Sequence, residues 1–93
     1  MISDMILWAV KSLRTKGSSM FSRKQIREEI ENRWPNYDKK WWDNSGSPIF
    51  QFMRKECPHL NIAVSDKYRN VFERVSYGVH QLTEYGERLI QNY

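Results

Sequence analysis

Apolar residues near the start of the chain recur at the spacing of an α-helix. The stripe consists of Ile6, Ala9, Val10 and Leu13. Because residues three and four apart lie on one helical face, this spacing predicts a helix over residues 4–16. Ser3 is a suitable N-cap, and Gly17 is a suitable stop because glycine readily adopts the backbone conformation that ends a helix.

Three further apolar residues widen the apolar surface of this helix. They are Met5, Leu7 and Trp8. Two interpretations are open. These residues either pack against the last helix of the chain or form a seam between two copies, which would give a homodimer through the first helix.

A second helix is predicted after residues 20–21, which could themselves form a short strand. Ser22 and Gln25 match a capping box, in which each side chain bonds the other residue's backbone N–H. The apolar stripe of this helix is Ile26, Ile30 and Trp34. Pro35 should end it, because the residue before a proline disfavours helical geometry. The acidic residues expected on its surface are Glu28, Glu29 and Glu31.

Residues 48–57 are predicted to form a third helix. Ser47 is a good cap, and Pro48 suits the first helical position because no backbone N–H is needed there. The side chains expected inside are Ile49, Phe50 and Met53, and those expected outside are Ser47, Gln51, Arg54 and Lys55.

The last quarter of the chain predicts a hairpin and a short helix. Residues 71–75 and 79–82 are the candidate strands, joined at Gly78, where a positive φ is easiest. Thr83 should cap a helix that runs to about residue 91. A polar, basic helix beside a hairpin with basic residues is typical of a winged helix-turn-helix. We therefore expect one α+β, mainly α domain over residues 1–93, with a three-helix core, a two- or three-stranded wing and a C-terminal helix.

The charge of the chain favours a polyanionic partner. The formal net charge is +4 and the isoelectric point is about 9.4. Residues 1–33 hold seven Lys and Arg against four acids, and residues 34–75 hold seven against five. This balance is typical of proteins that bind nucleic acid, and it is also common among ordinary small proteins.

The single cysteine, Cys57, excludes a disulfide within the chain and fits a reducing cytosol. The start of the chain lacks the basic segment and cleavage site of a signal peptide, and no apolar run is long enough to cross a membrane. We expect a cytoplasmic protein, associated with the nucleoid if it binds DNA. Cys57 and His59 lack a second ligand pair, so no metal or other cofactor is expected, and no enzyme chemistry stands out.

An exposed helix fits the major groove of double-stranded DNA, where glutamine can pair with adenine and arginine with guanine. Gln51 and Arg54 of the third helix are the candidates, with Lys55 beside them. The candidates for phosphate contacts are Ser45, Ser47, Lys39, Lys40, Arg23 and Lys24. Those in the hairpin, which could reach a neighbouring groove or the backbone, are Arg74, Tyr77 and His80.

Other interpretations remain open for these residues. The third helix could present an ordinary solvated face, Arg74 could form a cross-strand ion pair, and Tyr77 could be a surface or packing aromatic. A protein–protein interaction module on the same fold is the main alternative function, since a fold does not determine function. Its mark would be an exposed apolar patch around Trp8 with Met5 or Trp41.

The segment RNVFERVSYGVHQLTEYG resembles the end of a winged-helix module. The recurring positions are Phe72, Gly78, His80, Leu82, Thr83 and Gly86. Together with SPIFQFMRKECPH, this segment is similar to the winged-helix domains attached to modification-dependent restriction endonucleases, some of which read methylated adenine in double-stranded DNA. The resemblance covers roughly residues 40–90. It implies a reader of modified DNA or a transcriptional regulator, with Trp41 or Trp42 against a methyl group. The sequence lacks the nuclease domain that often accompanies this module, so no restriction activity is expected.

Overall fold

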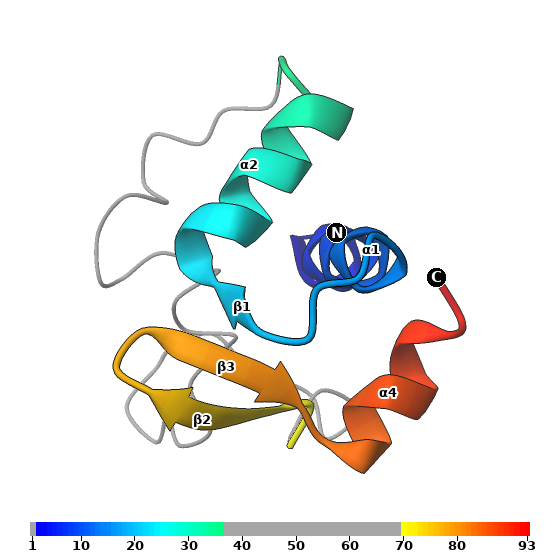
Figure 1. The fold of residues 1–93 in the computed structure, drawn as a ribbon. Coiled ribbons are helices and arrows are strands. Elements are labelled where there is room, and N and C mark those ends of the chain that lie inside the picture. Colours follow the sequence, from blue (N-terminus) through cyan, green and yellow to red (C-terminus); the bar gives the residue numbers. More distant parts are fainter. Residues whose placement is uncertain (1, 37–69) are drawn as a thin grey trace.

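The computed structural model describes residues 2–36 and 70–93. Within these residues, three helices and a three-stranded antiparallel sheet form an α+β fold (Figure 1). The elements are α1 (Ile2–Thr15), β1 (Phe21–Ser22), α2 (Arg23–Arg33), β2 (Phe72–Ser76), β3 (Val79–Leu82) and α4 (Glu84–Ile90). The α+β class is confirmed, whereas the helix predicted over residues 48–57 lies outside the described residues.

Helix α1 is central to the core and packs against both α2 and α4 (Figure 1). The predicted stripe faces inward, with Ile6, Ala9 and Val10 completely buried. Leu7 is also completely buried and Met5 nearly so, which means that a single copy of the chain already covers these two side chains. Met5 and Leu7 therefore have almost no exposed surface with which to contact a second copy. Trp8 is partly buried against the same core.

Helix α2 begins and ends where the sequence predicts. The Ser22 hydroxyl accepts the Gln25 N–H at 3.2 Å, and the Gln25 side chain accepts the Ser22 N–H at 2.9 Å, which completes the capping box. The helix ends at Arg33, just before Pro35, and Ile26 and Ile30 are completely buried.

The sheet joins the two ends of the described chain. Its strand order is β1-β3-β2, so the short β1 pairs with the second strand of the hairpin. Phe21 lies opposite His80, and Phe21 is 1% exposed. The predicted strand at residues 20–21 is thus one residue too early, because Phe21 is the residue that turns into the core while Met20 stays half exposed.

The junction between β3 and α4 shows why threonine and glycine stand at positions 83 and 86 of the segment RNVFERVSYGVHQLTEYG. Thr83 caps α4 by accepting the Gly86 N–H at 3.0 Å, and its own N–H donates to the Val71 carbonyl at 3.0 Å. A Cβ on Gly86 would lie 2.2 Å from that same carbonyl oxygen. Gly78 has φ +72° in the hairpin turn, as predicted. These motif residues therefore build the fold.

The prediction that Glu29 lies on the surface of α2 is wrong, because this residue is 7% exposed. One carboxylate oxygen accepts from the Ser12 hydroxyl at 2.6 Å and from the Lys16 ammonium at 2.7 Å. Ser12 lies in the last turn of α1 and Lys16 directly follows that helix, so the α2 sequence alone does not reveal these donors. The carboxylate therefore joins α1 to α2.

We expect the stability conferred by Glu29 to depend on pH. The hydrogen bonds from Lys16 and then Ser12 lower the pKa of Glu29 below its ordinary value of 4.5, although burial acts in the opposite direction. A depressed folded-state pKa gives stability that is present above the unfolded-state pKa and is lost as the pH falls through the folded-state pKa. The effect should amount to about 1–2 kcal/mol, since charged hydrogen bonds are worth roughly that much and Lys16 is largely solvated.

The measurement is urea-induced unfolding of wild type and Glu29→Gln at about pH 7 and about pH 3.5. The substitution should cost stability at the higher pH and little at the lower one. Glu31→Gln is the matched control, because Glu31 is more exposed and pairs with Arg27 at 3.8 Å within the same helix. Equal losses for Glu29→Gln at both pH values would contradict the prediction.

Candidate nucleic-acid interface

The hairpin places its predicted site residues near one end of the sheet. Arg74 lies opposite His80 in the register of β2 and β3, and both fall on the same sheet face as Phe72 and Leu82 because side chains alternate along a strand. Tyr77 lies in the turn and is 92% exposed. The structure therefore brings these three predicted residues together.

Arg74 does not form a cross-strand ion pair with any acid in the described parts of the chain. Its Nε donates to the Ser76 carbonyl at 3.3 Å, and its guanidinium lies 5.5 Å from the centre of the Tyr77 ring. The neighbouring acid, Glu73, instead accepts a hydrogen bond from Gln81 across the strands. The cross-strand ion pair is thus not formed among the described residues, and Arg74 presents its charge beside an exposed aromatic ring.

The surroundings of His80 favour its neutral form. Burial, and after it the positive charge of Arg74, lower the pKa of His80 below its ordinary value of 6.5. Its Nδ1 is buried and lacks a hydrogen-bond partner, and its ring meets Phe72 edge-on with the ring centres 6.3 Å apart. The hairpin strands carry Arg74 against Glu73, so the expectation of a basic hairpin is wrong: its formal charge is zero.

The positive charge nearest to the hairpin turn belongs to α2. Ser22 pairs with Val79, so α2 begins beside the turn (Figure 1). The first turn of α2 carries Arg23 and Lys24 and contains no acid. The N-terminal end of a helix is itself partly positive, so two cations there disfavour the helix and favour a bound anion. Lys24 is exposed, whereas Arg23 is partly buried and already engaged in an interaction.

The other predicted site residues lie outside the described residues. They are Ser45, Ser47, Gln51, Arg54, Lys55, Lys39 and Lys40, together with Trp41 and Trp42 of the suggested methyl contact. Of the predicted interface, the structure thus places Arg23 and Lys24 on α2 and three residues of the hairpin.

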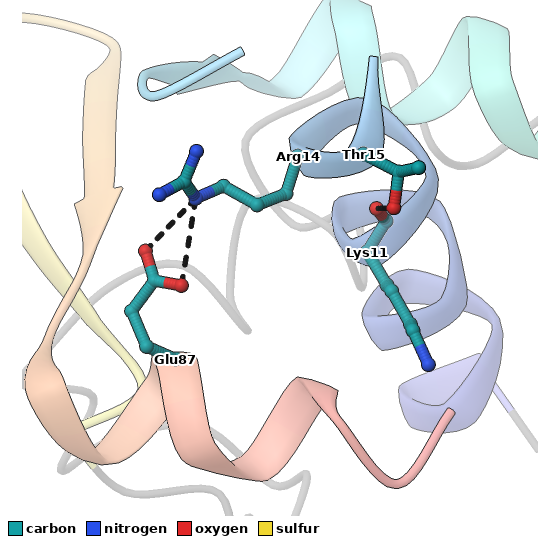
Figure 2. A network of polar contacts seen from close by, with 4 residues as sticks. All are labelled: Lys11, Arg14, Thr15 and Glu87. Carbon is teal, nitrogen blue, oxygen red and sulfur yellow. Dashed lines mark hydrogen bonds and ion pairs between the residues drawn. The ribbon is translucent and has the colours of Figure 1, made fainter. Parts of the chain in front are cut away.

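A cleft of about 290 Å³ lies between α1 and α4. Its polar groups mostly bind one another. Arg14 donates to Glu87 at 3.0 Å, as Figure 2 shows, and Lys11 donates to the carbonyls of Gln91 and Tyr93. These contacts hold α4 against α1, so the cleft is accounted for by packing of the fold.

The apolar patch predicted around Trp8 has a different form in the structure. Met5 is buried, and Trp8 meets Trp34 edge-on with ring centres 5.1 Å apart. The Arg33 guanidinium lies 5.6 Å from the centre of each ring. The sequence alone does not reveal this cluster, because Trp8 belongs to α1 and Trp34 caps α2, and only the crossing of these helices brings the two rings together.

Comparisons with known proteins add no further assignment. No family model, curated protein or solved structure matches the chain. None of the helices in residues 2–36 and 70–93 has the length and apolar character needed to cross a bilayer.

Proposed function

We propose that this chain is a winged helix-turn-helix module that binds double-stranded DNA. The element order supports this fold, because a helix, a short strand and a second helix precede a hairpin whose returning strand pairs with the first strand. The third helix predicted over residues 48–57 would complete the core between α2 and β2.

The observation that carries the proposal is the position of the first turn of α2 beside the hairpin turn. Lys24 and the helix end present positive charge there, and Arg74 adds a second cation from the hairpin. Neither cation serves the fold through an ion pair with an acid among the described residues. Lys and Arg side chains bind DNA phosphates, and such contacts position a protein on the duplex.

The third helix would supply base readout in this arrangement. Gln51 and Arg54 would reach adenine and guanine edges in the major groove, and Lys55 would approach the backbone. The hairpin would lie along the neighbouring backbone, with Arg74 as its cation. A single module makes a small interface, so a second copy or a partner domain would raise its affinity.

The first test measures salt-dependent binding by fluorescence anisotropy. A labelled mixed-sequence duplex is titrated at about 50 mM and about 200 mM salt with wild type and with Lys24→Ala/Arg74→Ala. We expect wild-type affinity to fall steeply with salt. The double variant should bind more weakly and lose about two units of the logarithmic salt slope, one for each phosphate contact removed.

The matched control is Arg14→Ala/Arg88→Ala, which removes the same net charge from α1 and α4. Arg14 pairs with Glu87 and Arg88 with Glu84, away from the hairpin turn. This variant should keep the wild-type slope. Arg54→Ala/Lys55→Ala tests the third helix in the same assay. Absence of binding at the lower salt concentration, by protein that circular dichroism shows to be folded, would contradict the proposal.

A further inference from the structure

Tyr77 is the most exposed large hydrophobic side chain in the described residues. It is 92% exposed, compared with 46% for Val75 in the same hairpin. An aromatic ring gains stability by being buried, and tyrosine is enriched where such a ring meets a partner. The turn would accept a small polar residue at this position as readily. The fold therefore gives no reason for an aromatic ring at the tip of the hairpin.

The ring is accompanied by a cation that is itself attached to the turn. The Arg74 guanidinium lies 5.5 Å from the ring centre, and its Nε donates to the Ser76 carbonyl at 3.3 Å. A cation is attracted to the face of an aromatic ring, and Tyr77 remains exposed beside Arg74. The tip thus offers a flat apolar surface directly beside a group that binds phosphate.

We propose that Tyr77 stacks on an unpaired nucleobase, and that the chain prefers duplex DNA interrupted by a short single-stranded gap over continuous duplex DNA. This inference rests on the proposed DNA-binding function and defines its substrate. In a continuous duplex, neighbouring base pairs cover both faces of every base, so stacking first requires unstacking of the helix. At a gap, one face of a base is open. Stacking on tyrosine is then available at little cost, while Arg74 holds an adjacent phosphate.

The test compares two labelled duplexes of equal length, one continuous and one with a central gap of two nucleotides, so that both have the same ends. Wild type should bind the gapped duplex about 5- to 150-fold more tightly, the range expected for stacking of one base. Tyr77→Ala should abolish this preference, because it should lose more affinity for the gapped duplex than for the continuous one. Tyr77→Phe should retain the preference, because it keeps the ring and removes only the hydroxyl.

Val75→Ala is the matched control, since it shortens an exposed apolar side chain two residues away, and it should retain the preference. A fluorescent adenine analogue at the gap gives a second readout, because its emission should be quenched by wild type and by Tyr77→Phe but not by Tyr77→Ala. Equal wild-type affinity for the two duplexes would overturn the inference and leave the proposed function standing. The inference would also be overturned if Tyr77→Ala retained the preference for the gapped duplex, or if it lost affinity equally for the two duplexes. In either case the proposed function would stand. No binding to either duplex by folded protein would overturn both.

Discussion

Replacing Gly86 with alanine should destabilise the protein by about 3 kcal/mol or more, the upper range for forcing an added carbon into a packed site. The new Cβ would lie 2.2 Å from the backbone oxygen of Val71, a separation that no side-chain rotation can relieve. That oxygen also accepts the Thr83 N–H, so its displacement would disturb the start of α4 as well.

The direction of this effect is informative, because helix propensity alone predicts the opposite result. Alanine is favoured over glycine by about 1 kcal/mol inside a helix. Urea-induced unfolding followed by circular dichroism measures the change. The control is Gly78→Ala. Its added carbon meets nothing within 4 Å, so it should cost only the roughly 1 kcal/mol of a positive φ. A Gly86→Ala protein as stable as wild type would show that α4 does not approach Val71 as closely as described.

Phe21→Ala should cost about 3–5 kcal/mol, the usual range for removing a fully buried phenylalanine. Phe21 is 1% exposed, and it is one of the two residues that form β1. Its ring belongs to the core formed with the helices, while its backbone pairs with His80 of the hairpin. The substitution should therefore weaken the attachment of the hairpin to the rest of the domain.

The loss of stability is measured by urea-induced unfolding, and the local effect by amide hydrogen exchange at Val79 and His80. A small domain has only about 5–15 kcal/mol of stability, so Phe21→Leu is included as a milder variant that should keep most of it. Met20→Ala is the matched control. Met20 is 50% exposed, so its truncation should change stability by no more than about 0.5 kcal/mol. Equal effects at positions 20 and 21 would contradict the assignment of Phe21 to the core.

The residues that stabilise the fold differ from the residues of the proposed binding surface. Gly86 and Phe21 stabilise the framework, whereas Lys24, Arg74 and Tyr77 are exposed and make few contacts that the fold requires. Variants of the exposed residues should therefore remain folded, and changes in their DNA affinity can be interpreted directly. Thr83, Gly86 and Gly78 likewise contribute to the framework.

The sequence by itself determined the features that depend on neighbours along the chain. The capping box of α2, its end before Pro35 and the Thr83 cap of α4 were all predicted, and the structure confirms them. The inward face of α1 and the return strand 79–82 were predicted from periodicity as well. These features follow from local hydrogen bonding and from the spacing of side chains along a helix or strand, both of which can be read from a short segment.

Only the tertiary structure decided which segments meet. It buried Glu29 beneath Lys16 and Ser12, placed Val71 against Gly86, and set the cation-bearing first turn of α2 beside the hairpin turn. It also lowered the pKa of His80, first through burial and then through the positive charge of Arg74. Each result depends on the approach of elements far apart in sequence, and periodicity within a single element carries no information about that approach.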